Sequence, residues 1–203
     1  MSRIEAGVQP RLYLVTHPHP KWFDQVTLLL SEGVSIVQIR DKSASDDVLS
    51  RDVESILNFV EQQGFDCTVL LNDRVHLAQQ FNIGVHLGQS DMLPSEARKI
   101  LGSEVSIGWT IHDRIDIIES QQEHIQYVGV GPVFQTQTKL DTQSVLGVSR
   151  LAEVCRLSSI PVVAIGGINK DNIASVYSAQ PWGIAMSSAL MQTNRLHPFL
   201  CRG

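Results

Sequence analysis

The segment TVLLNDRVHLAQQFNIGVHLGQSD (68–91) contains one complete unit of the pattern that decides the fold. Two short apolar runs, 68–72 and 84–87, flank residues 74–81, which show a weak helical pattern of apolar positions. The apolar runs are continuous rather than alternating, as is typical of strands covered on both faces. The segment therefore predicts a parallel strand–helix–strand unit.

The same rhythm extends outward in both directions along the chain. The eight apolar runs are RLYLVT (11–16), VSIVQI (34–39), TVLLN (68–72), GVHL (84–87), VSIGWT (105–110), QYVGVG (126–131), PVVAIGG (161–167) and WGIAMSS (182–188). One strand, one helix and two loops need roughly 24 residues, so eight units need roughly 190. The 203 residues thus predict an α/β fold of one domain, 1–203: a closed (β/α)8 barrel with an eight-stranded parallel sheet. An open eight-stranded sheet is the alternative.

Helical patterns fill the gaps between these runs. The clearest is 45–63, where Leu49, Val53, Ile56, Leu57 and Val60 form one apolar stripe, Ser45 can cap the start and Gly64 can end the helix. Two gaps depart from the rhythm: 132–146 predicts a long loop, and the short remainder after the eighth run predicts a last helix that is short or missing. Weaker helical patterns lie at 21–32, 74–81, 94–101, 114–122, 147–156 and 171–178.

Composition excludes several classes of protein. With 43% hydrophobic residues, the chain is neither disordered nor fibrous. Sixteen Lys and Arg against 21 Asp and Glu give a net charge of −5, which argues against a nucleic-acid partner. No apolar run approaches the ~18 residues of a membrane span, and the first residues lack the apolar region of a secretory signal. Cys67, Cys155 and Cys201 are far apart, which predicts reduced thiols in a cytoplasmic protein.

Polar side chains gather directly after the predicted strands. In a barrel, the carboxyl ends of the strands meet on one face, where active sites are built. The polar groups that follow seven of the runs are Gln38 to Lys42, Asn72 to Arg74, Gly88 to Asp91, Thr110 to His112, Thr136 to Lys139, Gly166–Gly167 and Ser187–Ser188. The last two pairs predict a phosphate site, because glycines let backbone N–H groups approach an anion and barrels often hold phosphate there.

Asp73 and Asp91 follow neighbouring predicted strands. A carboxylate about 4 Å from a phosphate charge costs on the order of 4 kcal/mol at an effective dielectric of about 20, so beside pyrophosphate these acids need a cation. Mg²⁺ suits them, since it takes one or two carboxylates plus phosphate oxygens. Ordinary ion pairs with nearby Arg and Lys explain the residues equally well. Of the histidines, His86 is interpreted as a packed structural residue, His112 as a candidate acid or base, and His17 has no evident partner.

Five of these stretches, taken in order, resemble the thiamine phosphate synthase family. They are VQIRDK (37–42), LNDRVHLA (71–78), GVHLGQSD (84–91), YVGVGPVFQTQTK (127–139) and VVAIGGI (162–168). The resemblance runs from about residue 11 to about residue 190. It implies a (β/α)8 barrel enzyme that joins hydroxymethylpyrimidine pyrophosphate to hydroxyethylthiazole phosphate, giving thiamine phosphate and pyrophosphate.

The resemblance also implies roles for individual residues. The substrate-binding set is Gln38, Ile39, Arg40, Asp41, Lys42, Asn72, Thr110, Thr136, Gln137, Thr138, Lys139, Gly167, Ser187 and Ser188. Within it, Arg40, Lys42 and Lys139 would be catalytic by neutralising the leaving group. Asp73 and Asp91 would bind Mg²⁺. The expected partners are small molecules only, and assembly into a homo-oligomer stays open.

Four positions depart from the family pattern: Thr110, where the family usually has Ser; Gln135 and Gln137, where it often has Pro; and His17, where it usually has Asp. An isomerase of the same fold, resembling thiazole tautomerase, is the alternative function, and it would use His112. Members of that branch tend to lose the acid of the Asn72–Asp73–Arg74 motif, which this chain keeps. A non-catalytic phosphate-binding paralogue is the third possibility.

Overall fold

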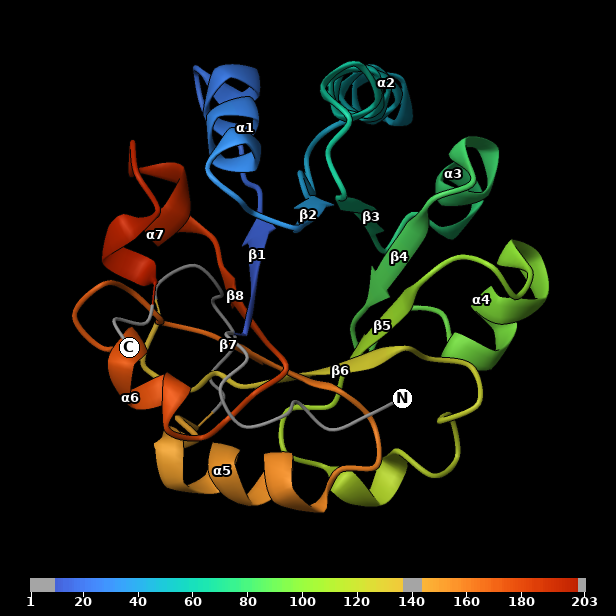
Figure 1. Cartoon of the computed structure of the whole chain (residues 1–203). Coiled ribbons are helices and arrows are strands. Elements are labelled where there is room, and N and C mark those ends of the chain that lie inside the picture. The colour runs from blue at the N-terminus through green and yellow to red at the C-terminus, as the bar shows by residue number, and fades with distance from the viewer. Residues whose placement is uncertain (1–9, 137–143, 201–203) are drawn as a thin grey trace.

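A computed structural model describes residues 10–136 and 144–200 of the chain. Eight parallel strands pair in sequence order, and β8 pairs with β1, so the sheet closes into a barrel as predicted. Helices surround the barrel in Figure 1, with α1 and α2 on one side and α5 on the opposite side. The strands are β1 (Arg11–Val15), β2 (Ile36–Ile39), β3 (Thr68–Asn72), β4 (Gly84–Leu87), β5 (Ile107–Thr110), β6 (Tyr127–Val130), β7 (Val162–Ile165) and β8 (Gly183–Met186).

The helices confirm most of the predicted pattern. Ser45 caps α2 by accepting a hydrogen bond from the backbone N–H of Val48, and Gly64 ends it in the left-handed conformation. The helices of the described residues are α1 (Trp22–Ser31), α2 (Asp46–Gln63), α3 (Val75–Phe81), α4 (Pro94–Leu101), α5 (Gly147–Leu157), α6 (Ile173–Tyr177) and α7 (Ser188–Met191), with 3₁₀ turns η1 (Ile115–Ile117) and η2 (His197–Phe199). The last α-helix is short, as predicted.

One predicted helix is wrong. The pattern at 114–122 gives only η1, followed by turns. Ile118 is buried, but the next apolar residue is Ile125, and the residues between them are polar. A helix continuing from η1 would therefore have no further apolar contact with the barrel.

Strand alternation divides the buried residues into two cores. Side chains such as Leu14, Val37 and Val85 point outward and pack under the helices. The barrel interior holds a smaller cluster: Tyr13, Val15, Ile36, Leu70, Tyr127, Val163 and Ala185. Because the inward side of each strand is fixed by its register, polar residues at inward positions near the strand ends must face the interior or its upper rim.

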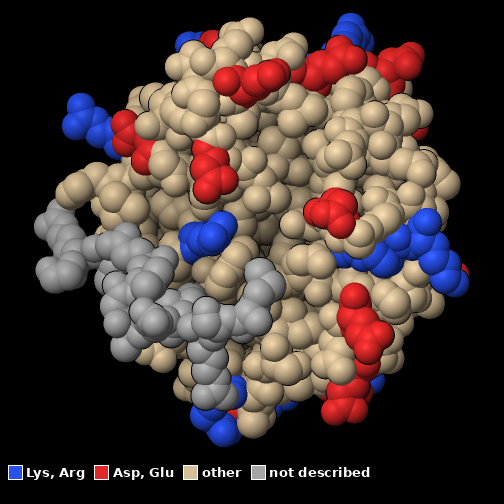
Figure 2. Space-filling view, turned by 45° about the vertical axis from the view of Figure 1, so that its right-hand side comes forward, with Lys and Arg blue, Asp and Glu red and all other residues tan. Residues whose placement is uncertain are grey.

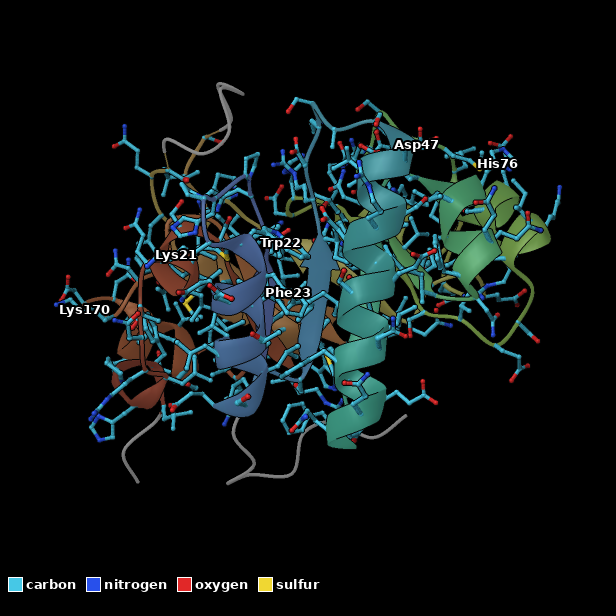
Figure 3. All side chains as sticks on the ribbon, turned by 90° about the horizontal axis from the view of Figure 1, so that it is seen from above. Lys21, Trp22, Phe23, Asp47, His76 and Lys170 are labelled. Atoms are coloured by element: carbon cyan, nitrogen blue, oxygen red, sulfur yellow. The ribbon has the colours of Figure 1, made fainter. Side chains whose placement is uncertain are left out.

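The helices are also joined to one another. Figure 3 shows α1 and α2 side by side outside the strands, and the Phe23 and Phe59 rings of these helices meet edge to face with centroids 6.2 Å apart. Gln25 of α1 donates hydrogen bonds to the backbone carbonyls of Leu190 and Thr193, which ties α1 to the short α7 across the closure of the barrel.

Two further properties bear on the sequence predictions. Among the described residues, no helix is both long and apolar enough to span a bilayer. Cys67 and Cys155 are free thiols, and burial raises the pKa of each to about 12. Cys201 lies outside the described residues.

Candidate active site

The carboxyl ends of β2, β3 and β5 bring three predicted site residues to the upper end of the barrel interior. Gln38, Asn72 and Thr110 occupy inward positions, and Gln38 and Thr110 are only 3% and 8% exposed. A buried amide or hydroxyl requires hydrogen-bond partners, so these side chains are held in fixed orientations by their neighbours.

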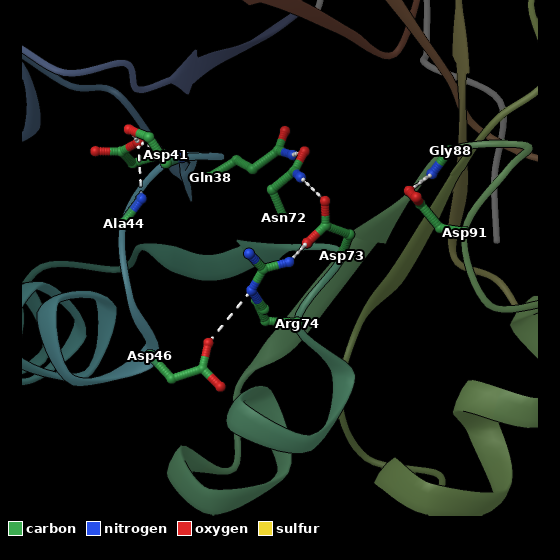
Figure 4. A network of polar contacts seen from close by, with 10 residues as sticks. Gln38, Asp41, Ala44, Asp46, Asn72, Asp73, Arg74, Gly88 and Asp91 are labelled. Atoms are coloured by element: carbon green, nitrogen blue, oxygen red, sulfur yellow. Dashed lines mark hydrogen bonds and ion pairs between the residues drawn. The ribbon is translucent and has the colours of Figure 1, made fainter.

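A polar chain leads from Gln38 to the rim (Figure 4). The Gln38 Nε2 atom donates to Asn72 Oδ1 at 2.8 Å, and Asn72 Nδ2 donates to Asp73 Oδ2 at 2.7 Å. Arg74 donates to the other Asp73 oxygen at 2.6 Å and also pairs with Asp46 at 3.3 Å. The Asp73 carboxylate is therefore oriented by contacts on both of its oxygens.

Asp73 lies in a strained and electrostatically crowded place. Its φ of 55° is left-handed, a conformation that non-glycine residues adopt mainly where function or packing demands it. Burial raises the pKa of Asp73, and the Asp91 charge raises it further, while Arg74, Lys42 and Arg40 act in the opposite direction. The structure thus brings the second predicted metal ligand and two predicted catalytic cations within electrostatic range of Asp73.

The surroundings of the two acids fit a divalent cation. Asp91 Oδ2 accepts a hydrogen bond from the Gly88 N–H at 2.6 Å, which holds its carboxylate in place. Two oxygen-bearing, mutually repelling acids form a hard donor pair of the kind Mg²⁺ takes when substrate phosphate supplies the remaining oxygens. Within the described residues, no set of three or more His, Cys, Asp or Glu is arranged to hold a metal ion.

Charged side chains of both signs lie around a hollow on one face of the molecule in Figure 2.

Two predicted substrate-binding residues after β2, Ile39 and Asp41, direct their side chains to contacts within the protein. The Ile39 side chain is 1% exposed in the outer core, which leaves only its backbone for a ligand. Asp41 Oδ1 accepts hydrogen bonds from the backbone N–H groups of Ser43 and Ala44 and from the Ser43 hydroxyl. The Ser43 hydroxyl bond is the main reason that the pKa of Asp41 is lowered, and these bonds shape the β2–α2 loop.

The predicted phosphate residues lie at the ends of β7 and β8. Gly166 and Gly167 have φ values of 102° and 65°, and a Cβ on Gly167 would lie 2.5 Å from the Gln135 carbonyl oxygen. The loop after β7 therefore touches the loop after β6, which continues to Thr136. Ser187 and Ser188 lie where α7 begins, and Gln137, Thr138 and Lys139 lie outside the described residues.

His17, for which the sequence names no partner, faces this end of the barrel. Its Nδ1 atom lies 3.2 Å from the Ser187 hydroxyl, and burial, together with the charges of His19 and Arg40, lowers its pKa. His112 has a φ of 57° and its Nδ1 lies 3.0 Å from the Gly131 carbonyl oxygen. A cavity of about 440 Å³ lies beside His112 and the Asp113–Arg150 ion pair.

His86, interpreted from the sequence as a packed residue, has hydrogen bonds at both ring nitrogens: Nδ1 lies 2.9 Å from the Tyr127 hydroxyl and Nε2 lies 2.8 Å from the Thr110 hydroxyl. Sequence reasoning missed Tyr13 and Tyr127, whose hydroxyls are 2.8 Å apart beneath the site. Their only signal in the sequence is an inward position, counted in steps of two from the end of each predicted strand.

Comparison with known proteins supports a specific family. A family model described as thiamine monophosphate synthase matches residues 12–190. A thiamine-phosphate synthase of Clostridium novyi (strain NT) is 39% identical over 165 residues, covering 80% of this chain and 79% of its own length. One of Synechococcus sp. (strain CC9311) is 37% identical over 91% of this chain, which spans about half (53%) of that relative's length.

A solved structure shares the whole architecture. The thiamine phosphate pyrophosphorylase from Pyrococcus furiosus superposes with a TM-score of 0.79 and 30% sequence identity, covering 90% of this chain and 88% of its own. The family model, the sequence identity and the shared barrel cover nearly the same residues, which confirms the resemblance found in the motifs. On these grounds the chain belongs to the thiamine monophosphate synthase family.

Proposed function

We propose that this chain is a transferase that joins hydroxymethylpyrimidine pyrophosphate to hydroxyethylthiazole phosphate, forming thiamine phosphate and pyrophosphate. The observation that carries the proposal is the grouping at the barrel rim of Asp73 and Asp91 with Arg40 and Lys42. A site of this composition suits a pyrophosphate leaving group that is held both by basic side chains and by a metal ion bound to the two carboxylates. The names of the relatives point to the same reaction.

In this reaction the bond between the pyrimidine methylene carbon and the pyrophosphate oxygen breaks, and the electron pair leaves with the oxygen. The electron-rich aminopyrimidine stabilises the resulting cationic methylene carbon, and the thiazole nitrogen attacks that carbon. Arg40, Lys42 and Lys139 would neutralise the departing charge, while Gln38, Asn72 and Thr110 would orient the pyrimidine pyrophosphate. Ile39 would contribute only its backbone, and Asp41 would keep the loop in shape.

Asp73 and Asp91 would hold Mg²⁺. When bound, the cation would screen the pyrophosphate charge that these carboxylates would otherwise repel. The raised pKa of Asp73 supports this assignment, because a carboxylate destabilised by burial and by a second acid gains from a nearby cation.

The thiazole phosphate would lie at the ends of β7 and β8, on Gly167, Ser187, Ser188, Thr136 and Thr138. The first N–H groups of α7 have no partner within that helix and are suited to an anion. Gln137 and Lys139, which lie outside the described residues, follow Thr136 in the sequence and would also bind the substrates.

The experiment is a coupling assay with the purified chain, both substrates and Mg²⁺, in which thiamine phosphate and pyrophosphate are measured together. Equal amounts of both products, dependent on each substrate and on the cation, are expected. Conversion of a thiazole tautomer without coupling would instead identify the isomerase, and phosphate binding without any turnover would identify the non-catalytic paralogue. The negative net charge argues against a nucleic-acid partner. That the protein is cytoplasmic and that it can assemble into a homo-oligomer are predictions from the sequence.

A further inference from the structure

A series of buried and partly buried hydrogen bonds crosses the barrel interior beneath the candidate active site. Beyond Gln38 it continues through the Tyr13 hydroxyl, 2.9 Å from Gln38 Oε1, to the Tyr127 hydroxyl at 2.8 Å. From Tyr127 it passes to His86 Nδ1 at 2.9 Å, and from His86 Nε2 to the Thr110 hydroxyl at 2.8 Å. The Asp73 carboxylate and the Thr110 hydroxyl are thus connected by hydrogen bonds through the barrel interior.

The central member of this chain, Tyr127, is held tightly in place. A Cβ on Gly108 would lie 2.1 Å from Tyr127 Cζ, so the ring occupies space that only glycine leaves open. The ring stacks against His86, with centroids 5.6 Å apart, and against Trp182, with centroids 6.2 Å apart. Burial raises the pKa of Tyr13 and of Tyr127, which keeps both hydroxyls protonated.

Counting the available protons fixes which group donates and which accepts in each hydrogen bond from Asp73 to Tyr13. The Asp73 carboxylate only accepts, so the Asn72 amide must turn its NH₂ toward Asp73 and its carbonyl oxygen toward Gln38. Gln38 therefore donates from Nε2 to Asn72 and must accept at Oε1 from Tyr13. A cation bound at Asp73 would leave this direction unchanged, because the carboxylate still accepts.

The second half follows from the first. The single Tyr13 proton is used toward Gln38, so Tyr13 accepts from Tyr127. The Tyr127 proton is then used as well, so Tyr127 accepts from His86, and the proton of a neutral His86 must be on Nδ1. The bare Nε2 atom then accepts from the Thr110 hydroxyl.

We propose that Tyr127 is a positioning residue that locks neutral His86 in its Nδ1–H tautomer and thereby turns the Thr110 hydroxyl into a pure hydrogen-bond acceptor toward the substrate. If Thr110 contacts the pyrimidine substrate, which rests on the proposed function, its ligand partner is an N–H donor such as an exocyclic amino group. A ring carbonyl or a phosphate oxygen beside Thr110 would face only the lone pairs of its hydroxyl oxygen and could not form a hydrogen bond with it.

The tautomer can be measured on the unliganded protein, independently of any activity. Two-dimensional ¹⁵N–¹H spectra of the histidine rings at pH 8 distinguish a protonated from a bare ring nitrogen, and a His86→Asn variant assigns the signal among the seven histidines. We expect His86 to show Nδ1 protonated and Nε2 bare in the wild type. Tyr127→Phe should move both signals toward those of the Nε2–H tautomer. Tyr177→Phe, which changes a tyrosine bound to the Phe199 carbonyl, is the matched control and should leave them unchanged.

In the coupling assay, Tyr127→Phe should raise KM for the pyrimidine pyrophosphate about tenfold, the effect of losing one buried hydrogen bond, with a smaller change in kcat. An Nε2–H tautomer in the wild type would overturn the proposal, as would unchanged His86 signals in Tyr127→Phe. If Tyr127→Phe does not fold, the assigned wild-type spectrum still decides whether His86 carries its proton on Nδ1. A locked tautomer in a protein without coupling activity would count against the proposed function and leave the role of Tyr127 standing.

Discussion

Gly108→Ala tests how tightly the barrel interior fixes Tyr127. The added Cβ would lie 2.1 Å from Tyr127 Cζ and 2.3 Å from its hydroxyl oxygen, so the ring must move. Overpacking a core costs about 1–3 kcal/mol, and a buried hydroxyl that loses its partners costs about 1–3 kcal/mol. The lower chain entropy of alanine in the unfolded state returns about 0.4–1 kcal/mol. We expect a net loss of roughly 2–4 kcal/mol in the free energy of unfolding.

Gly183→Ala is the matched control, because it also adds a methyl group to an inward glycine of the barrel. Its Cβ would meet its nearest neighbours, the Arg11 carbonyl oxygen and a Val163 methyl group, at 3.4 Å, which is ordinary contact. Urea unfolding of both variants should separate them by about 2 kcal/mol or more, with Gly183→Ala within about 1 kcal/mol of the wild type. Equal stabilities of the two variants would refute the claim that Gly108 is required by the Tyr127 ring.

Four further predictions concern the proposed site. Asp91→Asn should sharply lower turnover and weaken its dependence on Mg²⁺, and an unchanged rate at limiting Mg²⁺ would remove Asp91 from the ligands. Because burial and the Asp91 charge raise the pKa of Asp73, protons should displace a bound cation at a higher pH than from an ordinary aspartate. Titrations with Mn²⁺ at a series of decreasing pH values measure this, and a binding loss at the pH of a normal aspartate would contradict it. Lys139→Ala should lose coupling and release free hydroxymethylpyrimidine by hydrolysis, whereas normal coupling would make the lysine a surface charge. Gly167→Val should weaken thiazole phosphate binding in calorimetric titrations while pyrimidine pyrophosphate binding stays nearly unchanged; equal losses of both would mean that the two-site map is wrong.

The parts of the fold that follow from local pattern were predictable. Each predicted strand contains the observed one, because a strand buried on both faces needs an uninterrupted apolar run. The long helix α2 was also predicted with its caps, since Ser45 and Gly64 act through bonds to residues close in sequence. The prediction of a helix at 114–122 was wrong because its apolar residues suffice for one turn only. A count of apolar positions does not show that a longer helix would have no further apolar contact with the barrel.

Some features of the candidate site were likewise predictable from the sequence, and others were not. The rule that barrel strands end on one face brought Gln38, Asn72 and Asp73 together correctly, since it depends only on where each strand stops. The sequence could not show that Tyr13 and Tyr127 meet, because they are 114 residues apart and their contact depends on the register of the closed barrel. The turn formed by Asp41 was missed for another reason: a carboxylate in a strand-end motif has the same sequence whether it faces a ligand or its own backbone.

The contact between His17 and Ser187 joins two residues separated by 170 positions, one on each side of the β1–β8 seam. During synthesis, the first of these residues leaves the ribosome long before the second. A growing polypeptide that has already made β1 to β7 and the glycines after β7 therefore holds Thr136 and Gly167 of the proposed thiazole phosphate site but still lacks Ser187 and Ser188. Contacts between such distant positions also form slowly, because ordering the long intervening loop costs entropy before the pairing is gained. Ligand affinity for the phosphate should consequently emerge late and abruptly in refolding, together with seam closure, rather than growing in step with helix content.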